Sequence, residues 1–541
     1  MSATKTFFEK NSALFVALVL FLIPVLFIEY RVMHWTHGVF AYPLDDSFIH
    51  MAVAKSLAFH EVWGISGHEF ESASSSLLYT LILAGAFKLL GASTVLPFVI
   101  NLIAAVILLI VVRNWLQAQG VGRTGELLIL AAVIFFTPLP ILVISGMEHT
   151  LQCLFSFLLI TRCASWVEEP DGPGGRRQKL PWPVYIYGML VTMIRYEGMF
   201  LVACVCLLLL FRRRFLSAVQ LGIVSLAPLF IFGLYSLSKG SYFFPNSVLL
   251  KSEPIPFSVH GILHLLSDSI FPKLTISTSG ISAIATQRLL IILPIAYLLF
   301  IRPLKGNPAY RNILLILIPC TLLQLSFAAT GWFYRYEAYL VFNSTVILGV
   351  LCWKYGRDIY RERIREVRWM AAFACLALFF PLLLRSTAAF QKASQACLNI
   401  YQQQYQMGSF LHQYYRDDVV GANDIGAVSY FTRAKNIDLW GLGNIDVAKS
   451  KKKNYWTPDF LDSLSRNQHM KVAIVYDSWF NHDLLRRWNK VATWQIQNNV
   501  ICGDNIVSFY AVNPTDSDDL KRNLVEYEKQ SLPAGVTVRY Y

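Results

Sequence analysis

The chain has 541 residues, of which 55% are hydrophobic and 15% are charged, and its mean hydropathy is +0.46. A soluble globular domain carries about 25% charged residues, so this composition excludes a large water-soluble core. The formal net charge of +13 does not indicate nucleic-acid binding, because the lysines and arginines lie in short segments between apolar runs and form no basic stripe on a folded domain.

Apolar runs long enough to cross about 30 Å of hydrocarbon recur within residues 1–387. They predict a polytopic α-helical membrane domain with about eleven spans. If these runs cross, the basic clusters 212–214, 302–311 and 354–368 fall on one side, which the positive-inside rule assigns to the cytoplasm. The N-terminus is then cytoplasmic and the C-terminus extracytoplasmic. The predicted spans are 12–30, 94–112, 126–146, 149–165, 183–196, 198–211, 216–238, 286–302, 311–328, 336–353 and 369–387.

Two long loops are predicted on the extracytoplasmic side, at 31–93 and 239–285. The first contains an apolar stretch, 76–90, that is too short to cross comfortably. We interpret it as one of two juxtamembrane helices in this loop, because a crossing there would move the basic clusters that follow it to the outside.

Residues 388–541 differ in kind from the preceding chain. They are polar, with short β-like runs at 419–422, 471–476 and 506–512, and Asp, Asn and Gly residues mark turns between helical stretches. This pattern predicts a soluble α/β domain outside the membrane.

The first candidate site residues are Asp45 and Asp46, which lie next to each other in the first outer loop. A carboxylate there could act as general base on a hydroxyl or hold a divalent cation. The alternative is that one of them caps the helix predicted to begin at Ser47.

Further charged residues fall on the same predicted side of the membrane. Glu148 and His149 follow the span 126–146, and an ionisable pair at such a junction is a functional candidate; the alternative is an interfacial Glu in water. Three cations, Arg195, Lys251 and Arg335, could bind a phosphate. The alternative for Arg335, which lies among aromatic residues, is snorkelling at the interface.

The order of these motifs resembles the GT-C superfamily of polyprenyl-phosphate-dependent glycosyltransferases, over about 42–340. Within it, the chain looks most like the branch with mycobacterial terminal arabinofuranosyltransferases, although relatives commonly have Pro at the position of Tyr196. The outer-domain stretches Asn423–Ala427 and Asp438–Leu442 are similar to that branch as well. The motifs that carry the resemblance are Leu44-Asp45-Asp46-Ser47-Phe48-Ile49, Ser145-Gly146-Met147-Glu148, Arg195-Tyr196-Glu197-Gly198, and Phe244-Pro245-Asn246-Ser247 with Lys251.

The resemblance implies roles for these residues. One of Asp45 and Asp46 would be the catalytic base, and Glu148 would be a second acid that positions the acceptor or a metal. The three carboxylates could then hold Mg²⁺, Mn²⁺ or Ca²⁺, although a metal-free base is equally consistent. Arg195, Arg335 and Lys251 would meet the donor phosphate. The residues expected to bind substrate are His149, Glu197, Asn246 and Tyr336.

The sequence therefore predicts a multi-pass enzyme of the bacterial inner membrane. It would move a pentose or hexose from a polyprenyl-phosphate donor to an envelope glycan, lipid or protein acceptor. Two other classes are open: a secondary transporter or flippase of an envelope precursor, and a membrane scaffold that presents residues 388–541 to a partner. Paired broken helices and an internal repeat are typical of many transporters; the sequence shows one broken region and no repeat.

Overall fold

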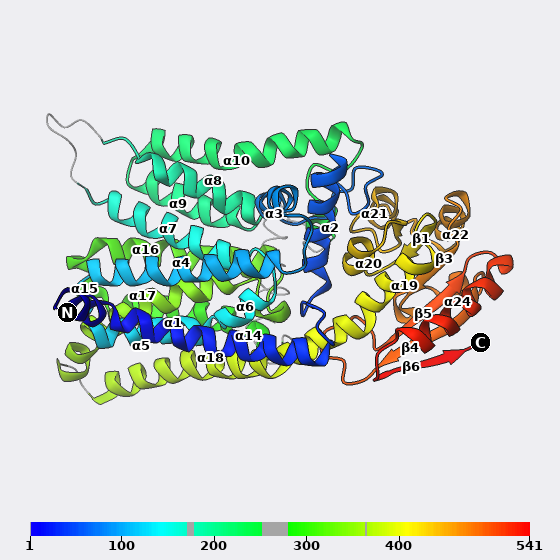
Figure 1. The fold of residues 1–541 in the computed structure, drawn as a ribbon. Helices are drawn as coiled ribbons and strands as arrows, with labels where there is room; N and C mark the ends of the chain where they lie inside the picture. Colours follow the sequence, from blue (N-terminus) through cyan, green and yellow to red (C-terminus); the bar gives the residue numbers. More distant parts are fainter. Residues whose placement is uncertain (1, 170–177, 251–279, 363–364) are drawn as a thin grey trace.

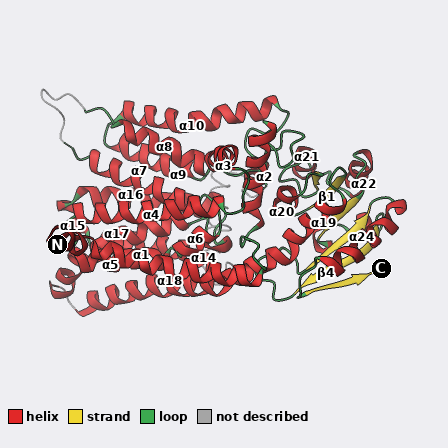
Figure 2. Cartoon of the chain, in the orientation of Figure 1, coloured by secondary structure: helices red, strands yellow, loops and turns green. Residues whose placement is uncertain are grey.

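The computed structural model describes residues 2–169, 178–250, 280–362 and 365–541. Long helices run side by side in a bundle, and a smaller unit with a β-sheet lies at one end of it (Figure 1). Helices make up the bundle, whereas the strands lie in the C-terminal unit (Figure 2). A C-terminal sheet is thus present, and the predicted domain boundary at 387/388 stays a prediction.

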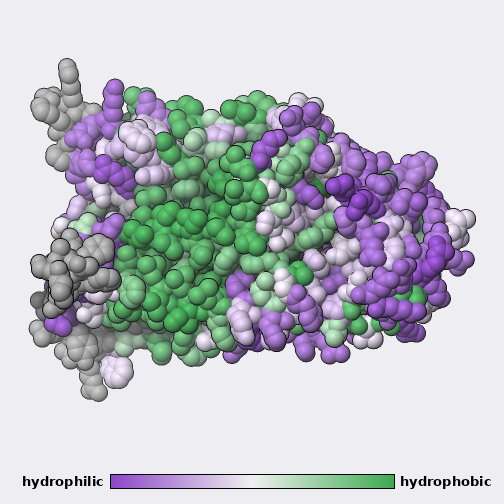
Figure 3. Space-filling model, viewed as in Figure 1, coloured by the Kyte–Doolittle hydropathy of each residue, from purple (hydrophilic) through white to green (hydrophobic). Residues whose placement is uncertain are grey.

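The bundle is built from helices of different lengths. Their bounds are α1 (Ser2–Trp35), α4 (Leu96–Ala118), α5 (Arg123–Phe136), α6 (Leu139–Ile144), α7 (His149–Trp166), α8 (Trp182–Ile194), α9 (Gly198–Phe211), α10 (Phe215–Ser238), α14 (Gly280–Leu299), α15 (Ile301–Gly306), α16 (Pro308–Phe327), α17 (Ala338–Glu362) and α18 (Arg365–Ile400). A belt of hydrophobic residues covers the middle of this bundle, and hydrophilic residues cover the C-terminal unit (Figure 3). This is the surface of a protein whose helices lie in a bilayer.

Five of the described helices are long and apolar enough to cross a membrane by length and composition. They are α1 from Asn11 onward, α4, α10, α16 and the Ala338–Arg357 part of α17. The expected number of about eleven spans is therefore not confirmed. Part of the reason is that the predicted span 126–146 is divided into α5 and α6 at Pro138, whose ring nitrogen cannot donate the helical hydrogen bond. The runs 183–196 and 198–211, predicted as two spans, form α8 and α9, and each of these helices is shorter than the 18 residues expected of a span.

Two further helices lie between α1 and α4. Helix α2 (Asp45–His60) runs across the end of the bundle, between it and the C-terminal unit, and α3 (Leu77–Leu90) lies beside it (Figure 1). Two acidic residues lie in the first turn of α2, where the negative charge of Asp46 complements the positive end of the helix dipole. The Ser76 hydroxyl accepts a hydrogen bond from the Tyr79 N–H and so caps α3.

The C-terminal unit is built on a six-stranded sheet of order β2-β1-β3-β5-β4-β6. The strands β2, β1 and β3 are parallel, and β5, β4 and β6 continue the sheet in antiparallel pairs. The strands are β1 (Val419–Ala422), β2 (Lys435–Asp438), β3 (Val472–Val475), β4 (Asn489–Ile496), β5 (Ile506–Ala511) and β6 (Val536–Tyr540). The helices of this unit are α19 (Gln406–Tyr414), α20 (Gly426–Phe431), α21 (Ile445–Lys452), α22 (Pro458–Asn467), α23 (His482–Leu485) and α24 (Ser517–Gln530).

A buried ion pair fixes the turn between α16 and α17. Arg385 of α18 lies 2.9 Å from the Glu337 carboxylate, both side chains are 0% exposed, and the guanidinium also donates to the Phe136 carbonyl at 3.2 Å. The second Glu337 oxygen accepts from the Gly331 N–H at 2.8 Å. These contacts hold the segment that carries Arg335.

Replacing Arg385 with Leu is expected to lower the free energy of unfolding by about 3–5 kcal/mol, because the Glu337 carboxylate would stay buried without its charged partner. Thermal unfolding of the detergent-solubilised protein measures this. The control Arg433→Leu, at an exposed position, should change stability by less than about 0.5 kcal/mol. A loss no larger than that of the control would show that this pair does not hold the turn.

Candidate functional site

A cavity of about 630 Å³ lies where the bundle meets the C-terminal unit. Its polar wall is formed by the start of α2, the segment before α3, the break between α8 and α9, and the turn before α17. The residues of this wall are Asp46, His50, Ser75, Arg195, Glu197, Arg335 and Tyr336. A second wall is apolar and includes Met199, Phe200, Phe244, Val248, Leu249, Leu250 and Phe327. Such a cavity can take a ligand that has a charged head and an apolar chain.

Asp46 faces the cavity and forms an ion pair with Arg335. The side chain of Asp46 is 23% exposed, whereas that of Arg335 is 1% exposed. The guanidinium also contacts the Met147 sulfur, and its carbon lies 4.9 Å from the centre of the Tyr336 ring. Arg335 is therefore held from several sides with one edge directed at the Asp46 carboxylate.

Asp45 has a different environment from its neighbour. Its Oδ2 accepts from the Gly426 N–H at 2.7 Å and its Oδ1 from the Ala427 N–H at 2.8 Å, so it caps α20 of the C-terminal unit. Burial raises the pKa of Asp45 to about 8, and the negative charge of Asp424 acts in the same direction. The cap predicted for the helix after Asp46 is absent, because α2 begins at Asp45 and has no side-chain cap of its own.

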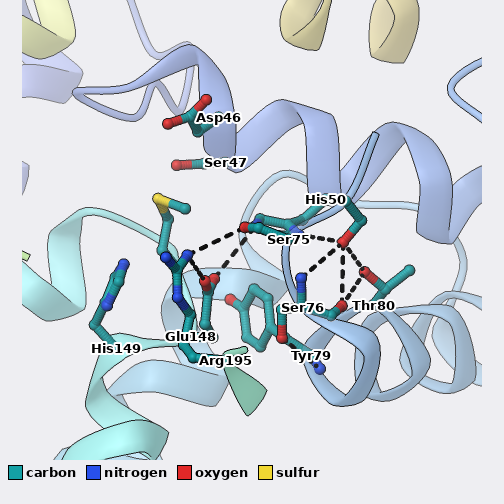
Figure 4. A network of polar contacts seen from close by, with 12 residues as sticks. Asp46, Ser47, His50, Ser75, Ser76, Tyr79, Thr80, Glu148, His149 and Arg195 are labelled. Atoms are coloured by element: carbon teal, nitrogen blue, oxygen red, sulfur yellow. Dashed lines mark hydrogen bonds and ion pairs between the residues drawn. The ribbon is translucent and has the colours of Figure 1, made fainter. Parts of the chain in front are cut away.

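Glu148 is enclosed between two cationic or basic groups (Figure 4). Its Oε1 lies 2.8 Å from the Arg195 guanidinium, and its Oε2 lies 3.2 Å from Nε2 of His50. Burial raises the pKa of Glu148, but His50, His149 and Arg195 outweigh it and hold that pKa well below its usual range. Glu148 is 0% exposed. Glu148 does not line the cavity itself, but it contacts Arg195 and His50, which both do.

Arg195 occupies the break between α8 and α9 and has an extended backbone. It pairs with Glu197 at 2.6 Å as well as with Glu148, and it donates to the Ser75 hydroxyl at 3.1 Å. The predicted interruption of the two short runs thus places a charged residue on a cavity wall, as expected for a break at membrane depth.

The remaining predicted site residues have varied positions. Glu197, Asn246 and Tyr336 line the cavity. His149 is buried behind this wall, its ring centre 6.3 Å from that of Tyr336 and its Nδ1 3.3 Å from the Gln152 amide oxygen. Lys251 lies outside the described residues.

Sequence analysis missed several contributors to the cavity, among them the basic residues His50, Lys451 and Lys452. His50 follows Asp46 by one helical turn, and this i, i+4 spacing could have placed both on one face of α2. The two lysines belong to a basic run, which carries no sequence signal for a cavity.

In the part of the chain that the structure describes, no group of three His, Cys, Asp or Glu side chains could hold a metal ion. The three carboxylates considered as ligands have separate partners: Asp45 binds backbone N–H groups, Asp46 pairs with Arg335, and Glu148 pairs with Arg195. As arranged, these residues do not fit a shared metal site. Metal dependence stays a prediction.

Comparison with known proteins gives one family model and a fold. The model, for a domain of unknown function (DUF8728), matches residues 398–510. No curated protein matches the chain.

ArnT from Cupriavidus metallidurans bound to undecaprenyl phosphate is structurally similar, with a TM-score of 0.51, 11% identity, and coverage of 92% of this chain and 98% of ArnT. The apo form of ArnT gives a TM-score of 0.50 at 11% identity, with 96% and 99% of the two chains covered. The likeness confirms the expected polytopic membrane fold as ArnT-like over nearly the full length of both chains. The arabinofuranosyltransferase branch is not confirmed.

The raised pKa of Asp45 gives a pH test. Between its ordinary value near 4 and about 8, the folded protein keeps a proton that the unfolded chain has lost, so the free energy of unfolding falls as the pH rises through this window. Asp45→Asn cannot ionise, so thermal unfolding from pH 5 to 8.5 should show the variant gaining stability relative to the wild type. If the wild type instead becomes more stable relative to the variant as the pH rises, the folded protein holds Asp45 ionised.

Proposed function

We propose that this chain is a membrane glycosyltransferase that moves a sugar from a polyprenyl-phosphate donor to an extracytoplasmic acceptor. The observation that carries this proposal is the pairing of Asp46 with Arg335 on the wall of a cavity that also contains Arg195. A carboxylate and two guanidinium groups are the charges that such a transfer needs.

The apolar wall of the cavity supports a lipid-linked donor. Side chains such as Phe200, Leu249 and Phe327 could contact a prenyl chain, while the charged head lies at the polar wall. The fold is shared with ArnT, which was crystallised with undecaprenyl phosphate. The proposed location of the protein is the bacterial inner membrane, with the cavity open to the outer face of that membrane.

Arg335 and Arg195 are the proposed contacts of the donor phosphate. Each guanidinium presents a planar set of N–H donors that matches phosphate oxygens. Both are already held by carboxylates, Arg335 by Asp46 and Arg195 by Glu148 and Glu197. Binding of a phosphate to Arg335 would weaken its hold on Asp46.

Asp46 is the proposed general base. Once released from Arg335, its carboxylate takes the proton of the acceptor hydroxyl. The hydroxyl oxygen forms a bond to the anomeric carbon as the bond from that carbon to the phosphate oxygen breaks, and the polyprenyl phosphate leaves with the electron pair. Direct displacement inverts the anomeric centre. Asp45 is a poor candidate for this role because both of its oxygens accept backbone N–H groups.

Asp46→Asn is expected to lower the rate of sugar transfer by at least about a hundredfold, because general-base help contributes about 10²–10⁴. The measurement is transfer of labelled sugar from a panel of polyprenyl-phosphate sugars to envelope extracts by the purified protein. Glu69→Gln is the control, since this carboxylate is exposed and does not line the cavity, and it should keep nearly all of the activity.

Equal transfer by wild type and Asp46→Asn would remove Asp46 from the chemistry. If the protein instead moves a lipid-linked sugar across vesicles without cleaving it, the transporter interpretation replaces the enzyme.

A further inference from the structure

Two lysines of the C-terminal unit lie on the wall of the same cavity. Lys451 and Lys452 end helix α21, and Ala448 and Leu442 line the cavity beside them. These lysines belong to the unit that contains the sheet, whereas Arg195 and Arg335 belong to the bundle. The cavity therefore has cations contributed from both parts of the molecule.

Both lysines are held against aromatic rings. The Lys451 ammonium lies 3.0 Å from the centre of the Trp440 ring and 4.5 Å from that of Trp456, and the Lys452 ammonium lies 4.8 Å from that of Tyr242. Cation–π contacts orient an ammonium group without consuming all of its donors. The two groups are thus positioned while they keep N–H donors for a ligand.

No carboxylate forms an ion pair with Lys451 or Lys452 among the described residues. Asp438 attracts Lys451, but its own oxygens accept the N–H groups of Trp440, Gly441 and Gly443 at 2.6–2.9 Å. Burial lowers the pKa of Lys451 to about 8. An anion in the cavity would offset this cost.

A simpler explanation is that cations at the end of a helix stabilise its dipole. That effect applies equally to Lys453, the next residue, which is exposed and does not line the cavity. It does not account for the aromatic contacts of Lys451 or for the shared cavity wall. The difference between consecutive lysines makes Lys453 a matched control.

We propose that Lys451 and Lys452 form an anion site for the acceptor, and that the acceptor carries a phosphate or carboxylate group. This rests on the proposed function. The donor is anchored in the bilayer and its phosphate is assigned to the bundle arginines, whereas a soluble or extended acceptor enters past the C-terminal unit. Tyr242, which also lines the cavity, could stack on a sugar ring, so the ligand class is an anionic glycan.

The test uses the full-length protein in an uncharged detergent, with glucose 6-phosphate and glucose as probes for equilibrium binding. The double variant K451Q/K452Q is expected to bind glucose 6-phosphate at least about tenfold more weakly, because hydrogen bonds to charged groups are lost. K453Q should stay within about twofold of the wild type. Binding of undecaprenyl phosphate should be unchanged in both variants.

Several results would overturn the proposal. One is a wild type that does not prefer glucose 6-phosphate to glucose. Another is a double variant that loses undecaprenyl phosphate binding instead, which would assign the lysines to the donor. A third arm adds bicelles with phosphatidylglycerol: lysine-dependent binding seen only there would assign the site to a lipid headgroup.

Failure of the donor assignment would have a separate signature. The wild type would then bind glucose 6-phosphate in a lysine-dependent way but would not bind undecaprenyl phosphate. In that case the anion site stands, and the polyprenyl-phosphate proposal falls.

Discussion

Side chains of helix α2 form hydrogen bonds with both ends of helix α20, and the geometry of the cavity depends on this contact between the two helices. Asp45 accepts the first N–H groups of α20, and Lys55 donates to the Tyr430 carbonyl near its last turn at 2.7 Å. The Asp45 oxygens thus satisfy N–H groups at the start of α20, and the Lys55 ammonium satisfies a carbonyl group near its end. Phe48 packs between them, its ring 5.6 Å from that of Phe431. Two helices from distant parts of the chain are thereby fixed in register.

This register determines where Asp46 points. Successive residues of an α-helix are about 100° apart around its axis, so a first carboxylate bound to α20 leaves the second directed elsewhere. In this structure that direction is the cavity and Arg335. The adjacent acids therefore divide two tasks, one of which is structural and depends on a partner 381 residues away in the sequence.

The buried ion pairs around the cavity also call for an explanation other than stability. An ion pair removed from water gains little net stability, because desolvation opposes the attraction. Arg335 and Arg195 are nonetheless both kept near one cavity, each with its own carboxylate, and Arg385 with Glu337 holds the turn behind Arg335. Such an arrangement is more readily explained by a need for oriented cations than by stability.

Sequence reasoning found what local composition can encode. The membrane class, the strands at β1, β3 and β5, and the charged break at Arg195 follow from hydropathy and residue order. Strand β2, with the sequence Lys-Asn-Ile-Asp, lacks an apolar pattern and is defined by its parallel partner β1. The choice between Asp45 and Asp46, and the presence of Lys451 in the cavity, depend on contacts between distant segments. No window of the sequence contains that information.

The C-terminal unit thus affects the cavity in two ways, and a truncation that removed the unit would not separate them. Through α20 it holds α2, and through α21 it supplies part of the wall. Removing the unit would release Asp45 and delete Lys451 together, so a loss of activity would not distinguish positioning from ligand binding. The two roles are carried by different side chains on different helices, and only substitutions confined to one helix can separate them. The unit is therefore better regarded as part of the site than as a lid placed over it.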